Sequence, residues 1–167
     1  MLLVLHDLPP ALAEEVLPPP DGETALFVAT PAVAPCVGCF ACWTRTPGIC
    51  VIDDRAREFA RLLPGARRLC VITRCVYGGV SPDVKAVLDR SIGYMLPYFK
   101  LVRGEMHHVQ RYERPFDLRY YFYGEDITEG ERATAEALIA ANALNYSSPS
   151  ARAHFYPDAR ALKGVRL

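Results

Sequence analysis

Four of the six cysteines fall between positions 36 and 50. They are spaced as Cys36-x2-Cys39-x2-Cys42, and Cys50 follows after seven further residues. Two-residue intervals let a tight turn bring three thiolates to one centre, and a fourth thiolate completes a tetrahedral set, as in iron–sulfur cluster loops. A single zinc ion more often uses two separated pairs. The spacing therefore predicts a cluster or metal site formed by Cys36, Cys39, Cys42 and Cys50.

Two other interpretations of these cysteines remain open. Reduced cysteine behaves as a small hydrophobic residue, so the four thiols would simply pack the loop. A reversible disulfide between two of them is the other alternative. The first residues, MLLVLHD, carry no basic flank and are too short for an export signal. We therefore expect a cytoplasmic protein, in which a permanent disulfide framework is not favoured.

A second candidate site follows an apolar run at 69–73. The segment Thr73–Ser81 contains Tyr77-Gly78-Gly79 and leads into a helix with proline at its first position. Two glycines permit close approach of the backbone to a flat ligand, and the tyrosine offers a ring for stacking. The alternative is a strand-to-helix turn that carries an aromatic plug.

The elements that must position these loops alternate along the chain. Apolar runs predict strands, and capping residues with helical spacing predict helices between them. The expected strands are 1–6, 24–29, 69–73, 116–123 and 151–156. The expected helices are 10–17, 82–95 and 129–145, together with one that follows the cap candidates Asp53 and Asp54 and is closed by Pro64–Gly65. Alternating strands and helices predict one α/β domain over 1–167 with a parallel sheet covered on both faces.

Segments 35–52 and 97–115 are left without a regular element by this scheme. Sites of open parallel sheets form at the carboxyl ends of the strands, so both segments are expected at that edge. His107 and His108 lie in the second segment. Adjacent residues of a strand point to opposite sides, so a shared metal ion is not expected there. We expect this segment to cover a ligand or to form a subunit contact. Asp89 and Arg90 are expected on a helix surface.

Two stretches resemble a known family. CVGCFACWTRTPGICVIDD at 36–54 and VYGGVSPDVKAVLDR at 76–90 are similar to flavodoxin-like NAD(P)H-dependent FMN reductases, especially the iron–sulfur flavoproteins. The resemblance implies a flavodoxin-like three-layer sandwich with a five-stranded parallel sheet, and FMN at the strand ends. It implies a 4Fe-4S cluster on the four cysteines, electrons from NAD(P)H or a ferredoxin-type donor, and a homo-oligomer. The flavin would lie against Arg74, Cys75, Val76, Tyr77, Gly78, Gly79 and Val80.

The first strand departs from this family. In members of the family, the first strand is followed by a Ser-, Thr- and Asn-rich turn that holds the FMN phosphate. In this chain the same position is occupied by Asp7-Leu8-Pro9-Pro10. Two prolines remove two amide donors, and a carboxylate repels a phosphate. The leading hypothesis is a flavin-dependent oxidoreductase or electron-transfer flavoprotein. The alternative is a non-catalytic flavodoxin-like module that has lost the phosphate loop and serves as a binding partner.

The composition excludes several other classes. Lys and Arg number 19, as do Asp and Glu, so no broad basic footprint for nucleic acid is expected. Apolar residues make up 51% of the chain, but they form no run long enough for a membrane helix. No Ser/His/Asp set and no Walker-type phosphate loop is present. We expect neither nucleic-acid nor membrane partners.

Overall fold

The computed structural model describes residues 1–167 and contains a five-stranded sheet in the order β2-β1-β3-β6-β7. Every neighbouring pair in this sheet is parallel. With the sheet strands numbered consecutively, this order is 2-1-3-4-5, that of flavodoxin-like folds. The fold prediction is therefore confirmed. The strands are β1 (Leu2–His6), β2 (Thr24–Val28), β3 (Arg68–Arg74), β6 (Asp117–Tyr123) and β7 (Ala151–Tyr156).

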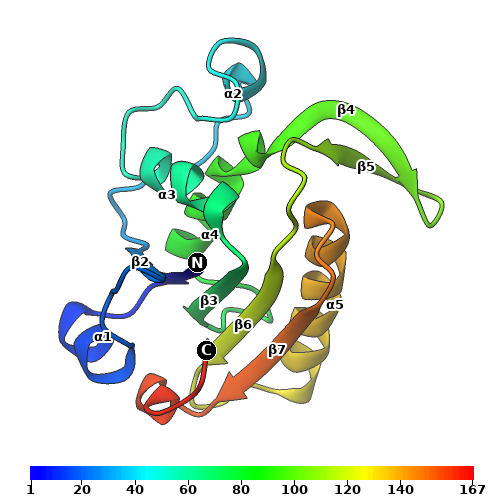
Figure 1. The fold of residues 1–167 in the computed structure, drawn as a ribbon. Coiled ribbons are helices and arrows are strands. Elements are labelled where there is room, and N and C mark those ends of the chain that lie inside the picture. Colours follow the sequence, from blue (N-terminus) through cyan, green and yellow to red (C-terminus); the bar gives the residue numbers. More distant parts are fainter.

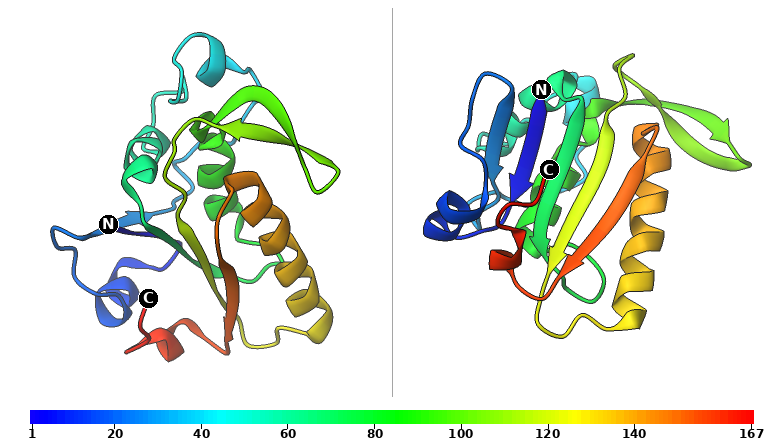
Figure 2. Two further views of the ribbon diagram at one scale, coloured as in Figure 1. Left: turned by 45° about the vertical axis from the view of Figure 1, so that its right-hand side comes forward. Right: turned by 60° about the horizontal axis from the view of Figure 1, so that its bottom comes forward.

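Helices cover both faces of the sheet (Figures 1 and 2). One hydrophobic cluster packs one face of the sheet against α3 (Ala56–Leu62), α4 (Pro82–Arg90) and α5 (Glu129–Tyr146). A smaller cluster packs the other face against α1 (Pro10–Val16) and the 3₁₀ turn Ala159–Leu162. No helix combines the length and the apolar character that crossing a membrane requires.

Alternation along each strand supplies both clusters. Leu3 and Leu5 belong to the larger cluster, whereas Val4 between them belongs to the smaller one. On β6, Tyr120 and Tyr121 divide in the same way. All five residues are nearly or fully buried, which explains why the strands read as unbroken apolar runs.

The predicted helix starts at positions 81 and 128 are confirmed. The Ser81 side chain accepts a hydrogen bond from the amide of Val84, and Pro82 stands at the first helical position. Thr128 and Glu131 form a reciprocal capping box at the start of α5. The helix after Ser81 is shorter than expected, because α4 ends at Arg90 and the 3₁₀ turn Ile92–Tyr94 follows it.

The connection 97–115 contains an unexpected β-hairpin. Its strands are β4 (Met95–Val102) and β5 (Glu105–Gln110), which pair antiparallel in a separate two-stranded sheet. Arg103 and Gly104 make the turn with φ values of 54° and 84°. The hairpin projects from the body of the molecule beyond α5 (Figures 1 and 2).

Segments 35–52 and 97–115 lie at the end of the sheet opposite to the one expected. Figure 1 shows the short helix α2 (Ala41–Thr44) and the hairpin beyond the ends from which β6 and β7 begin. Gly93, which follows α4, packs closely on the backbone of Gly48. A Cβ added to Gly93 would lie 2.9 Å from the carbonyl carbon and oxygen of Gly48. The indole of Trp43 donates to the carbonyl of Met95 at 2.9 Å. The cysteine segment therefore packs beyond the last turn of α4, near the amino ends of the strands.

Candidate functional site

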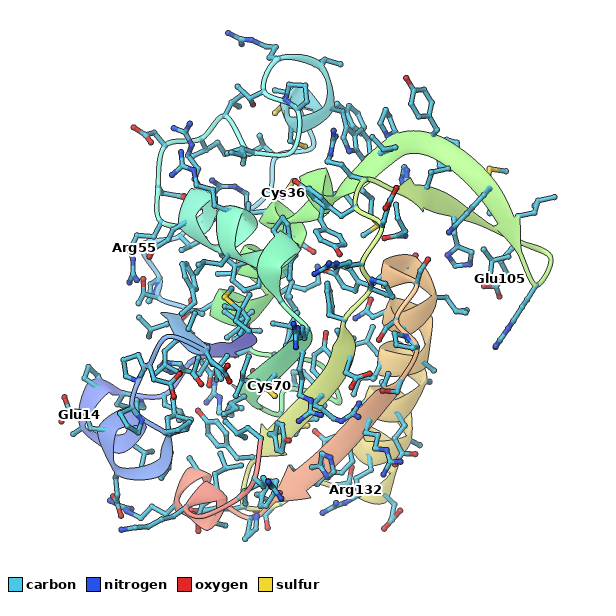
Figure 3. All side chains as sticks on the ribbon, viewed as in Figure 1. Glu14, Cys36, Arg55, Cys70, Glu105 and Arg132 are labelled. Carbon is cyan, nitrogen blue, oxygen red and sulfur yellow. The ribbon has the colours of Figure 1, made fainter.

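The four clustered cysteines line one open cavity of about 510 Å³. The rest of its wall comes from α4, α5, β6 and the residues around Trp43, and most of the lining is apolar. In Figure 3 Cys36 lies in the cysteine loop near the end of α4, whereas Cys70 lies within the sheet. The structure thus gathers the predicted ligands around a common space.

The four thiols differ in exposure. Cys36 and Cys39 are exposed, whereas Cys42 and Cys50 are each only 8% exposed, and none forms a disulfide. Burial raises the pKa of the Cys42 thiol, and the neighbouring Cys50 adds to this effect. No three His, Cys, Asp or Glu side chains stand close enough together to hold a metal ion. The donors suit an iron–sulfur cluster in number and type, but they line the cavity without converging on one point.

Arg90 holds the two ends of the cysteine loop together. The prediction that it lies on a helix surface is wrong. Its side chain is fully buried. Its Nε lies 2.9 Å from Cys50 Sγ, and its terminal nitrogens donate to the carbonyls of Ala34 and Ile52 at 2.7 and 3.0 Å. Both terminal nitrogens also contact the carboxylate of Asp54, at 2.8 and 2.9 Å. One guanidinium therefore joins both ends of the loop to the end of α4.

Asp54 accepts hydrogen bonds just before α3 begins and is also the partner of Arg90. Its two oxygens accept from the amides of Ala56 and Ala34, at 3.0 and 3.1 Å. Burial alone would raise the pKa of this carboxyl, but the hydrogen bonds from Arg90 and the two amides lower it overall. The carboxylate thus stays ionised and balances the buried guanidinium.

The predicted flavin loop lies at the carboxyl end of β3, away from the cysteine segment. Val76 and Gly79 exchange backbone hydrogen bonds of 3.0 and 2.8 Å, which close the loop into a tight turn. Tyr77 has φ of 51° and is 89% exposed, while Gly78 packs against Glu131 and Thr134 at the start of α5. Arg74 is exposed and Cys75 is half-buried. Val80 is the member of this set that lines the same cavity as the cysteines.

The carboxyl end of β1 does not fit the phosphate of FMN. Asp7 accepts hydrogen bonds from the hydroxyls of Thr73 and Tyr123 and from the amide of Arg74, at 3.0, 2.9 and 3.0 Å. Pro9 and Pro10 begin α1, which has no side-chain cap. The hydroxyl and amide donors at this edge are therefore already bound to the Asp7 carboxylate and cannot bind a phosphate. The two prolines have no amide hydrogen to add.

His107 and His108 fasten the hairpin to the body. Nδ1 of His107 lies 3.0 Å from the side-chain oxygen of Asn145 on α5. His108 contacts the carbonyl of Leu96 at 2.8 Å, and its ring packs against those of Trp43 and Phe99. Each imidazole thus has a structural partner, and the pair shares no metal-binding centre.

Comparison with known proteins gives a partial match. A region of 67 residues is 34% identical to an iron–sulfur flavoprotein of Methanosarcina thermophila. The match covers 40% of this chain and 34% of the relative, so the chain aligns with about a third of that protein. No protein-family model matches the chain. The match and the strand order support a relationship to flavodoxin-like flavoproteins, in agreement with the resemblance of the two loops.

Sequence reasoning did not identify two residues of the cavity region. Arg90 ends a helix beside Asp89, as many exposed arginines do, so only its place after the stretch VKAVL hinted at burial. Tyr120 sits within an aromatic strand whose residues appeared interchangeable. It is 1% exposed and lines the cavity, and its hydroxyl is buried beside the side chain of Asn142.

Proposed function

We propose that this protein is an electron-transfer protein whose cysteine loop binds an iron–sulfur cluster. The gathering of Cys36, Cys39, Cys42 and Cys50 around one cavity carries this proposal. The partial similarity to an iron–sulfur flavoprotein supports it. A bound cluster would supply one-electron chemistry, and the four cysteines would be its ligands. The electron donor would be a ferredoxin-type protein or a reduced nicotinamide.

The surrounding residues suit such a role. Arg90 and Asp54 hold the two ends of the loop, so the cysteine segment is fixed at its base while Cys36 and Cys39 remain exposed. The mainly apolar cavity wall would limit access of water to a cluster, which is one way in which a protein sets a reduction potential. These residues would hold the loop and shield a bound cluster.

The experiment that tests this proposal is an anaerobic purification followed by iron and acid-labile sulfide assays and a visible spectrum. We expect stoichiometric iron with a broad visible band that dithionite bleaches. Cys39→Ser should abolish both signals, whereas Cys75→Ser, outside the loop, should leave them unchanged. Protein that stays free of iron after anaerobic reconstitution with ferrous iron and sulfide would refute the cluster.

A second candidate function is a non-catalytic module that has lost the phosphate loop, and the contacts of Asp7 favour it. The carboxylate occupies three donors at the strand ends where a cofactor would otherwise bind. A flavin assay on the same anaerobic sample separates the two candidates. A protein with neither flavin nor iron, and with no uptake of added FMN, would be the module.

Restoring the loop tests how the site was lost. The triple change Asp7→Ser, Pro9→Thr and Pro10→Asn supplies hydroxyl and amide donors at the end of β1. If only this loop prevents FMN binding, the variant should quench FMN fluorescence in a titration and the unaltered protein should not. A variant that folds but binds no FMN would show that the closed 76–79 turn also blocks the site.

We further propose that the protein forms a homo-oligomer through the hairpin. Four large apolar side chains of the hairpin are 60–77% exposed: Tyr98, Phe99, Leu101 and Met106. Patches of this kind mark interaction surfaces. Light scattering after gel filtration should give a multiple of 18.6 kDa, and the double variant Leu101→Lys, Met106→Lys should give the monomer mass. A monomeric unaltered protein would contradict this assembly.

A further inference from the structure

A second hollow lies on the face of the sheet opposite to the cysteine cavity. The cysteine cavity is lined by Tyr120, whereas this hollow of about 210 Å³ is lined by Tyr121, which belongs to the other face of β6. On this side α1 and the 3₁₀ turn Ala159–Leu162 leave β6 and β7 without a covering helix (Figure 1). The hollow, which we call the arginine pocket, is lined by four arginines and one histidine: Arg68, Arg119, Arg152, Arg166 and His154.

Strand register places two of these arginines side by side. Arg119 of β6 is the register partner of Arg152 of β7, and Tyr121 with His154 is the next pair on the same face. Neighbouring strands lie about 4.8 Å apart, so the two guanidiniums extend from adjacent positions and repel each other. Burial, and then the charges of Arg119 and Arg152, lower the pKa of His154. Positive charge is thus concentrated at one point of the sheet.

The acidic groups around the arginine pocket do not balance its arginines. Asp117 is the one acidic side chain that pairs with them, and its carboxylate lies 3.8 Å from both Arg68 and Arg119. Arg68 also donates to the carbonyl of Leu167 at 3.0 Å. Arg152 is exposed and makes neither a hydrogen bond nor an ion pair. Even with a terminal carboxylate at Leu167, four guanidiniums face two carboxylates, so the pocket favours an anion.

From these observations we infer that the arginine pocket binds a phosphate group, either as the free ion or as the monoester of a small compound. A phosphate monoester carries a charge of about −1.5 to −2 at pH 7, and planar guanidiniums bind its oxygens through paired hydrogen bonds. An anion between Arg119 and Arg152 would remove their mutual repulsion. The pocket is smaller than the roughly 300–1,000 Å³ that encloses a whole organic ligand, so the rest of a monoester would lie outside it, beside the rings of His154 and Tyr156.

Inorganic phosphate and phenyl phosphate are suitable probes, because they share the phosphate and only the second has a ring. Binding to the purified full chain is measured by calorimetry at constant ionic strength in a buffer without other phosphate. We expect both probes to bind saturably. Tighter binding of phenyl phosphate would identify a monoester as the ligand, and equal binding would identify the free ion. In NMR spectra the ring signals of His154 should shift, and those of His107 in the hairpin should not.

Arg152→Gln removes one exposed guanidinium and should weaken both probes about ten-fold, as expected for a hydrogen bond to a charged group. Arg166→Gln, a second exposed position of the pocket, should weaken them as well. Arg132→Gln is the matched control, because it removes the same charge on the other side of β7, where Arg132 lies over the ring of Phe155. The inference is overturned if neither probe binds saturably, or if Arg152→Gln and Arg166→Gln bind the probes as well as Arg132→Gln does.

A short single-stranded oligonucleotide distinguishes a small ligand from a polymer. Lys and Arg do not exceed Asp and Glu over the whole chain, so we expect the oligonucleotide to bind no more tightly than phenyl phosphate at physiological salt. Much tighter binding that depends on Arg152 would assign this face to nucleic acid and overturn the small-ligand inference.

These assays also separate the inference from the proposed function. Phosphate binding requires no iron and involves no electron transfer, so a failure here leaves the cluster proposal untouched. Equally, an iron-free protein that binds phenyl phosphate through Arg152 would retain the arginine pocket and lose the cluster.

Discussion

The carboxyl end of the sheet and the region beyond its amino end are built in opposite ways. At the carboxyl end, Asp7 takes up hydroxyl and amide donors from β3 and β6, and the 76–79 turn closes on itself. Near the amino end, four free cysteines surround an open cavity and the hairpin exposes apolar side chains. The edge where this fold usually binds its ligand is closed by its own side chains, whereas the chemically reactive groups lie where the fold is usually inert.

This contrast shows that a shared strand order does not fix the position of a site. The strand order is that of flavodoxin-like folds, but polar contacts within the chain engage the donors at its carboxyl end. Variants at each end therefore measure how much each arrangement stabilises the protein.

The largest effect is expected at the base of the cysteine loop. Arg90→Met leaves the carboxylate of Asp54 without its buried partner and should lower the free energy of unfolding by about 3–5 kcal/mol. Lys85→Met on the same helix breaks only the exposed pair with Asp89 and should change it by less than about 1 kcal/mol. Urea denaturation measures both. Equal losses in the two variants would mean that the buried pair does not hold the loop.

The carboxyl end should show a specific acid sensitivity through His6. Burial lowers the pKa of this imidazole from 6.5 to about 4, although Asp7 opposes the shift. Between these two values the unfolded chain binds more protons than the folded one, so stability falls as the pH drops from about 6.5 to 4. The full loss is on the order of 3 kcal/mol.

Urea midpoints of the unaltered protein and of His6→Gln, measured from pH 7.5 to 4, test this. The variant should lose less stability on acidification. His154, whose pKa burial also lowers, and Asp54 titrate in both proteins, so their contributions cancel in the difference. Parallel curves would show that His6 is not responsible.

A smaller effect is expected from Asp7 itself. Asp7→Ala leaves the Tyr123 hydroxyl and the Arg74 amide without their acceptor and should cost about 1–3 kcal/mol. The same change at Asp53, whose only ion pair is the exposed one with Arg57, is the control and should cost less than about 1 kcal/mol. If both variants were equally stable, the carboxyl end would not be closed by these contacts.

The smallest effect compares one glycine of each region. Gly78 has φ of 79°, and an added Cβ would stand 2.7 Å from the carbonyl of Glu131 and from Cβ of Thr134. Gly104 in the hairpin turn has φ of 84° but open space around it. Gly104→Ala should therefore cost only the backbone strain of about 1 kcal/mol, and Gly78→Ala should cost more. Thermal denaturation of the two variants gives the order, and a reversed order would contradict the packing of the 76–79 turn on α5.

The sequence was sufficient to predict the sheet, because its strands are buried on both faces and its helices begin with unambiguous caps at Ser81 and Thr128. The cysteines around the cavity were identified by their spacing. The hairpin was not, because its exposed apolar residues and the internal Pro97 obscure the alternation. Arg90 was missed because burial of a charged side chain depends on a partner distant in sequence, here Asp54.

The Arg90–Asp54 pair holds the base of the cysteine loop together, so the interior of this segment can vary while its ends stay in place. Arg90 joins Ala34 to Asp54, so the 18 residues between positions 35 and 52 form a loop whose ends stay together whatever its interior does. The entropy of closing such a loop grows only with the logarithm of its length, and doubling the length adds about 0.6 kcal/mol. Residues can therefore be inserted or exchanged in the exposed run 35–40 at little expense to the folded domain, whereas the buried Cys42 and Cys50 are held by their packing. The exposed part of the cysteine segment can therefore vary in evolution, or in the laboratory, independently of the sheet that supports it.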